Sequence, residues 1–87
     1  AADVALCSRL LVPEPLATIV TPVALTATRA GRVPRRYIQC LDDRLLPLAT
    51  QRRMLDRSPC ERVDALATGH SPFFAAPAAL AALLAAP

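Results

Sequence analysis

Residues 33–47 have the sequence VPRRYIQCLDDRLLP, and this stretch decides the fold of the chain. Its centre, residues 35–41, places aromatic, β-branched and other apolar side chains between a proline and two aspartates. This composition predicts a buried strand that ends at Asp42-Asp43.

Three further elements follow this strand along the chain. The spacing predicts a helix over residues 47–57, and one of its sides carries Leu48, Gln51, Met54 and Leu55. Residues 62–67 are compatible with a second strand, and residues 75–86 predict an alanine- and leucine-rich helix that has Pro77 in its first turn and packs against the sheet. A strand, a helix and a strand in this order form a βαβ unit with parallel strands. We therefore predict the α/β fold class.

A two-stranded parallel sheet cannot form a core by itself, because parallel strands need cover on both faces. The chain has 87 residues, of which only 3% are aromatic, and residues 1–31 predict only short helices interrupted by prolines. A self-contained domain of this size buries only about 60% of its unfolded surface. We therefore expect the rest of the sheet to come from elsewhere, and the chain alone to be marginal and prone to self-association through its open sheet edge.

The charge pattern argues against a nucleic-acid partner, although the net charge is +3. The ten arginines are spread from Arg9 to Arg62, and their densest group, over residues 32–36, has only three. Aromatic residues that would stack on bases are missing between them.

The cysteines and the single histidine also exclude several classes of site. Cys7, Cys40 and Cys60 are odd in number and lack paired ligand spacing, so we expect no disulfide framework, no metal and no cofactor. The uncharged residues 71–87 are too short to span a membrane, and residues 1–11 do not form a signal peptide. We therefore expect a cytoplasmic chain without a membrane partner.

Polar residues that could carry chemistry follow both predicted strands. Asp42 and Asp43 come directly after the first strand, and His70 lies in the loop after the second. Adjacent parallel strands place these loops side by side, so either aspartate could hydrogen bond to the histidine. An Asp–His pair is two-thirds of a catalytic triad. The same residues are also ordinary in turns and solvated loops, and spacing alone leaves both interpretations open.

Residues 32–87 resemble the C-terminal end of the α/β-hydrolase fold, and more narrowly the plant-type esterase and hydroxynitrile lyase group with its bacterial relatives. The similarity lies in residues 33–47, in the following QRRM at 51–54, and in the histidine loop TGHSPFF at 68–74. Residues 1–31 more loosely resemble the last part of the cap over the active site. The resemblance therefore implies two parts, the end of a cap over 1–31 and the last β-α-β-α segment of a parallel sheet over 32–87.

This resemblance also implies site residues and an activity. The family's acid lies shortly before a proline, which selects Asp43, four residues before Pro47, as the triad acid and leaves His70 as the base. The implied activity is carboxylic-ester hydrolysis of a small apolar substrate by a serine hydrolase. Lyases of this group carry a lysine directly after the histidine, whereas this chain has Ser71.

The chain departs from the family in the region that supplies the nucleophile. Ser8, Ser58 and Ser71 are its only serines, and none lies in a G-x-S-x-G-like elbow. We therefore expect a C-terminal part of a hydrolase that is inactive alone. The alternatives are a non-catalytic remnant and a small α/β interaction module.

Overall fold

The computed structural model describes residues 1–87, which divide into two compact units, Ala1–Arg32 and Val33–Pro87. The first unit contains the helices α1 (Ala2–Leu10) and α2 (Ala17–Val20) and the single 3₁₀ turn η1 (Ala30–Arg32). None of its helices buries a residue. This unit therefore has no core of its own, and its assignment to a cap stays a prediction.

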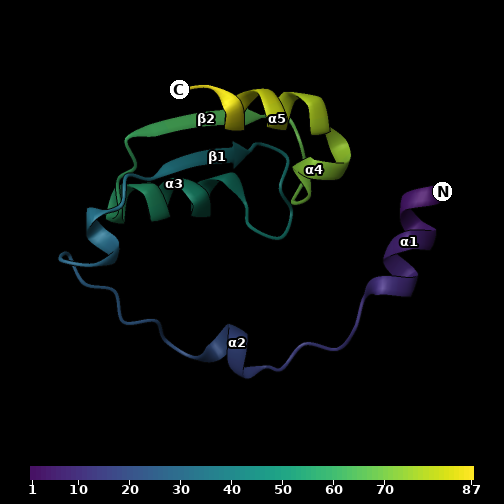
Figure 1. Ribbon diagram of the computed structural model, residues 1–87, viewed down its shortest axis with the longest axis horizontal. Coiled ribbons are helices and arrows are strands. Elements are labelled where there is room, and N and C mark those ends of the chain that lie inside the picture. The colour runs from purple at the N-terminus through teal and green to yellow at the C-terminus, as the bar shows by residue number, and fades with distance from the viewer. The chain divides into compact units, whose positions relative to one another are not determined.

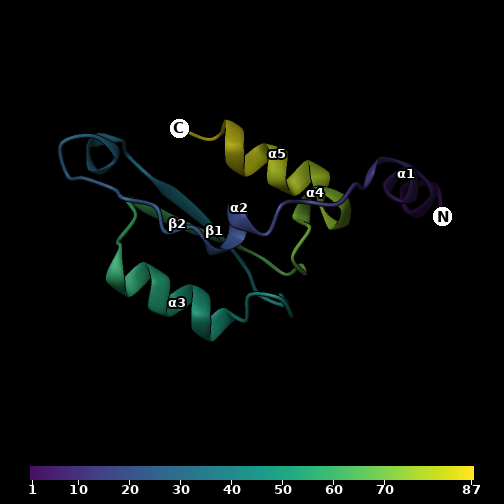
Figure 2. The ribbon, with the colours of Figure 1, turned by 90° about the horizontal axis from the view of Figure 1, so that it is seen from below.

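The second unit is a mixed α/β structure with a small parallel sheet. Its elements are β1 (Arg36–Cys40), α3 (Leu48–Arg57), β2 (Arg62–Leu66), α4 (Pro72–Ala75) and α5 (Pro77–Ala85). Strand β1 pairs in parallel with β2, with Arg36 opposite Arg62 and Cys40 opposite Leu66. Helices α3 and α5 lie on opposite faces of the two strands (Figures 1 and 2). The α/β class and the parallel strand order predicted from the sequence are confirmed.

The helix predicted over residues 75–86 is found as α5 over Pro77–Ala85, and the short helix α4 over Pro72–Ala75, which was not predicted, precedes it. Helix α4 ends at Ala75. The next residue, Ala76, has a φ of −147° and a ψ of 58°, which are not helical, and α5 begins at Pro77. Proline disfavours the helical conformation in the residue before it and cannot donate a backbone hydrogen bond. Pro77 therefore lies in the first turn of α5, as predicted, and the helix begins two residues later than expected.

The interior of the second unit is small and largely polar. Cys40 is the buried hydrophobic residue, whereas Asp43, Gln51 and Thr68 are the buried polar ones. Helix α5 contacts β2 but buries none of its residues, and Leu84 stays 67% exposed. The expectation that the last helix is buried against the sheet therefore does not hold in this structure. The buried residues therefore lie near the carboxyl ends of the two strands.

Two arginines hold the end of α5 to the beginnings of the strands. Arg36 donates hydrogen bonds to the carbonyl oxygens of Leu83 and Ala86, at 3.1 and 2.6 Å, and Arg62 donates to Pro87 at 2.9 Å. Both guanidinium groups also pair with the Asp64 carboxylate. Because the last carbonyls of a helix lack partners within it, the arginines satisfy them. None of the helices is both long and apolar enough to cross a membrane.

Candidate active site

The loops that follow β1 and β2 bring an aspartate and the single histidine into contact. Asp43 lies in the loop after β1, and His70 in the loop after β2. His70 Nδ1 and Asp43 Oδ2 are 2.9 Å apart. Their proximity follows from the parallel pairing, because both loops leave the sheet at the carboxyl ends of adjacent strands.

Asp43 is held rigidly as a carboxylate. Its side chain is only 4% exposed, and Oδ1 accepts hydrogen bonds from the backbone N–H groups of Leu45 and Leu46, both at 2.9 Å. The hydrogen bond from Leu46, followed by those from His70 and Leu45, keeps the pKa of Asp43 below its usual value of 3.8, although burial acts in the opposite direction. Asp43 therefore carries a negative charge at neutral pH.

The charge on Asp43 fixes the protonation pattern of the neutral His70 ring. An ionised carboxylate only accepts hydrogen bonds, so the proton of the neutral imidazole must lie on Nδ1. The lone pair is then on Nε2, which has no hydrogen-bond partner within the protein. The His70 side chain is 54% exposed, so the ring is reachable by a partner molecule. An imidazole in this state can accept a proton at Nε2.

The other candidate acid, Asp42, does not take part in this arrangement. Its side chain is exposed and makes no hydrogen bond, while its backbone N–H donates to the carbonyl of Thr68 at 3.0 Å. This bond ties the loop after β1 to the loop after β2, close to the Asp43–His70 pair. Asp42 therefore contributes to the site through its backbone.

Within its 87 residues the structure has neither a serine hydrogen bonded to His70 nor a group of side chains that could bind a metal ion. No serine hydroxyl is hydrogen bonded to His70: the Ser8 hydroxyl donates to Val4, and that of Ser58 accepts from Arg35. No group of three or more His, Cys, Asp or Glu side chains is placed to hold a metal ion.

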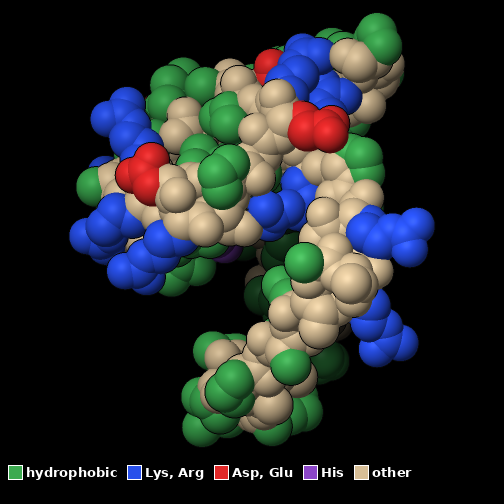
Figure 3. All heavy atoms as spheres, turned by 90° about the vertical axis from the view of Figure 1, so that its left-hand side faces the viewer, with side chains coloured by type: hydrophobic (Ala, Val, Ile, Leu, Met, Phe, Trp, Pro, Cys, Tyr) green, Lys and Arg blue, Asp and Glu red, His purple; other side chains and the backbone are tan.

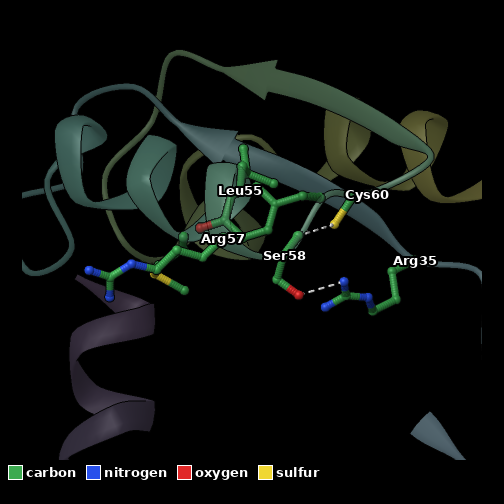
Figure 4. A pocket seen from close by; sticks show the side chains of 7 residues that line it. Arg35, Leu55, Arg57, Ser58 and Cys60 are labelled. Atoms are coloured by element: carbon green, nitrogen blue, oxygen red, sulfur yellow. Dashed lines mark hydrogen bonds between the residues drawn. The ribbon is translucent and has the colours of Figure 1, made fainter. Parts of the chain in front are cut away.

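A concavity of about 370 Å³ lies at the opposite end of the sheet from His70. It is lined mainly by apolar atoms between the start of β1 and the end of α3, from Tyr37, Met54, Leu55 and Cys60. Figure 4 shows Arg35 at this pocket with its guanidinium hydrogen bonded to Ser58. The pocket is lined by neither Asp43 nor His70 and is therefore separate from the pair.

Arginine side chains occur at several separate places on the surface that Figure 3 shows, with apolar and backbone atoms between them. Among the arginines of the second unit, Arg35, Arg36 and Arg62 are committed to intramolecular hydrogen bonds. Their presence therefore does not define a single basic patch on that face.

Gln51 is the residue whose importance the sequence did not reveal. The helical spacing placed it beside Leu48 and Leu55 on one side of the predicted helix, without a role of its own. In the structure it is 1% exposed and bonds both to the end of β1 and to the Asp43 loop. A lone amide on the apolar side of a helix was the available signal, since buried polar groups need partners.

Comparison with known proteins identifies ester hydrolases as homologues. A protein of Arabidopsis thaliana named as chloroplastic methylesterase 11 is 39% identical over 83 residues, which are 94% of this chain and 21% of the relative. The chloroplastic methylesterase 14 of the same plant is 36% identical over 83 residues, with 94% of this chain and 24% of the relative covered. A pyrethroid hydrolase of Sphingobium wenxiniae is 40% identical over 58 residues, or 66% of this chain and 21% of the relative.

These homologies confirm the resemblance to plant-type esterases and their bacterial relatives. The chain spans only about a fifth of the length of these relatives. No protein-family profile and no solved structure matches the chain. The prediction of a cytoplasmic location is wrong on this comparison, because the plant relatives are chloroplastic proteins.

Proposed function

We propose that this chain, a homologue of plant methylesterases and of a bacterial pyrethroid hydrolase, supplies the acid and the base of a serine α/β-hydrolase that cleaves carboxylic esters. Residues 1–31 form the end of its cap, and residues 32–87 form the last β-α-β-α segment of its core. The observation that carries the proposal is the 2.9 Å contact between His70 Nδ1 and Asp43 Oδ2.

In each half of this reaction His70 first accepts a proton and then donates it to the leaving group. Nε2 accepts the proton of a serine hydroxyl while the serine oxygen attacks the ester carbonyl carbon, and Nε2 then returns the proton to the departing alcohol oxygen. A water molecule repeats the cycle on the acyl-serine and releases the carboxylic acid. Asp43 stays ionised throughout, keeps the ring in the Nδ1–H form and stabilises the imidazolium.

Two features support hydrolysis of an apolar ester as the reaction of this site. Ser71 follows His70 where the lyases of the resembling group carry a lysine, so this position lacks the cation that would hold a leaving cyanide. The relatives named above are called a methylesterase and a pyrethroid hydrolase, which are names of ester-cleaving proteins. We therefore propose a small apolar ester as the substrate class.

A chimaera tests the proposal. The segment of methylesterase 11 that matches this chain is replaced by the 87 residues of the chain, and hydrolysis of p-nitrophenyl acetate by the chimaera is measured. We expect turnover, and we expect His70→Ala and Asp43→Asn each to lower kcat by about 10⁴-fold, as in other serine triads. Asp42→Asn is the matched control and should leave kcat within about twofold, because its exposed side chain makes no hydrogen bond to His70. A folded chimaera whose turnover survives His70→Ala would contradict the assignment.

The isolated chain provides a second test. No serine hydroxyl reaches His70 in it, so we expect no ester hydrolysis above that of its His70→Ala variant. Turnover by the chain that His70→Ala removes would show that one of its own residues is the nucleophile.

The open edges of the sheet support a second proposal, that copies of the chain associate through them. Strands β1 and β2 pair only with each other, and Val63 on β2 is 45% exposed. Exposed apolar strands with free edges pair readily with other chains. We expect the molar mass from light scattering to rise with concentration, and a strictly monomeric chain at high concentration would contradict this expectation.

A further inference from the structure

The carboxamide of Gln51 uses all of its hydrogen-bonding capacity in the interior. Its Nε2 donates to the carbonyl oxygens of Cys40 and Leu46, at 2.9 and 2.8 Å. Its Oε1 accepts from the Cys40 N–H at 3.1 Å and from the Tyr37 hydroxyl at 3.4 Å. With 1% exposure, Gln51 is the most deeply buried side chain of the protein.

The two bonds to Cys40 make the Gln51 amide a substitute for a neighbouring strand. Peptide groups of alternate residues point to opposite edges of a strand, and the Leu41 N–H points to β2, where it donates to Leu66. The N–H and C=O of Cys40 therefore point to the outer edge of β1, where both are bonded by Gln51. A buried peptide left without partners there would be costly.

The third strong bond of Gln51 reaches the far end of the loop that carries Asp43. The Leu46 carbonyl accepts from Gln51, while the Leu46 N–H donates to Asp43 Oδ1 at 2.9 Å. One side chain thus fixes the loop at Cys40, where it begins, and at Leu46, where its N–H meets the carboxylate. The same N–H is the main cause of the lowered pKa of Asp43.

We propose that Gln51 is the positioning residue of the site: by clamping Cys40 and Leu46 it holds the backbone N–H groups on Asp43 and so sets the orientation and charge of the carboxylate that faces His70. This inference rests on the proposed function for its catalytic meaning, but the clamp itself can be measured without a substrate. Gln51 touches neither His70 nor a reacting atom, so its effect passes through Asp43.

The test is the Gln51→Met substitution in this 87-residue chain, because methionine has nearly the same length but no amide. NMR titration of the Asp43 carboxyl carbon should show its pKa rising towards the usual 3.8. The Leu45 and Leu46 N–H groups should exchange with solvent about ten- to a hundredfold faster, as expected when the loop loses buried hydrogen bonds. The matched control is Gln39→Met on β1, whose side chain makes no hydrogen bond and which should change neither quantity.

The experiments separate three outcomes: a Gln51→Met variant that does not fold, a Gln51 that does not position Asp43, and a chain that is not part of an esterase. If Gln51→Met does not fold, Gln51→Asn retains the amide but is one methylene shorter, and it should show the same changes. An unchanged Asp43 pKa and unchanged exchange at Leu46 in a folded variant would overturn the inference and leave the Asp43–His70 proposal intact. In the chimaera Gln51→Met should lower kcat at unchanged KM, whereas inactivity of the unmutated chimaera would count against the proposed function alone.

Discussion

Replacing Asp43 with asparagine should reverse the tautomer of the neutral His70 ring. Asp43 Oδ1 accepts two backbone N–H bonds, so the asparagine oxygen must stay there and its NH₂ group must take the place of Oδ2, 2.9 Å from Nδ1. A donor at that distance requires a lone pair on Nδ1 and moves the ring proton to Nε2. Leaving two donors face to face would cost about 1–3 kcal/mol, so the tautomer ratio should change by about 5- to 150-fold.

Nitrogen-15 NMR of the imidazole distinguishes the two tautomers and measures this change directly. The unmodified chain should show a protonated Nδ1, and Asp43→Asn a protonated Nε2. Asp42→Asn is the control, since its exposed side chain makes no hydrogen bond to the ring. A folded Asp43→Asn variant that keeps its proton on Nδ1 would refute the reasoning that the carboxylate sets the base.

Two further predictions concern stability. Because the folded-state pKa of Asp43 lies below its unfolded value, its contribution is complete above about pH 3.9 and disappears as the pH falls through the folded-state value. Urea unfolding should therefore show a loss of stability in acid that is smaller in Asp43→Asn, and equal acid sensitivity of the two would contradict this. Arg36→Met should lower the free energy of unfolding by about 2 kcal/mol, because two charged hydrogen bonds to α5 carbonyls are lost from a side chain that is one-third exposed. Arg52→Met, on the exposed side of α3, is its control. An equal effect of both substitutions would argue against a role of the Arg36 hydrogen bonds in holding the end of α5.

The order of the core elements follows from local sequence because each has a clear pattern. Apolar and β-branched residues before Asp42-Asp43 mark β1, and helical spacing before Ser58-Pro59 marks α3. The sequence places Pro77 correctly in the first turn of the last helix, but it does not reveal the short helix α4 just before it. The non-helical backbone of Ala76 separates the two helices.

Exposure is another property that local patterns could not give. Met54 on α3 and Leu84 on α5 have the sequence character of core residues, yet they are 45% and 67% exposed. Apolar character predicts which face of a helix or strand tends to be buried, but the residues that bury it are distant in sequence. With only two strands in the sheet, much of that cover is absent from this structure.

The sequence by itself determined that an aspartate and the histidine follow successive parallel strands, since this needs only the strand patterns and the 27-residue separation of Asp43 and His70. Spacing alone left Asp42 and Asp43 equivalent, although the family resemblance favoured Asp43. The tertiary structure distinguished them, because only the loop conformation decides which carboxylate meets the Leu45 and Leu46 N–H groups and the ring. The role of Gln51 is also visible only there, since it depends on the Cys40 peptide pointing to the edge of β1 that no strand occupies.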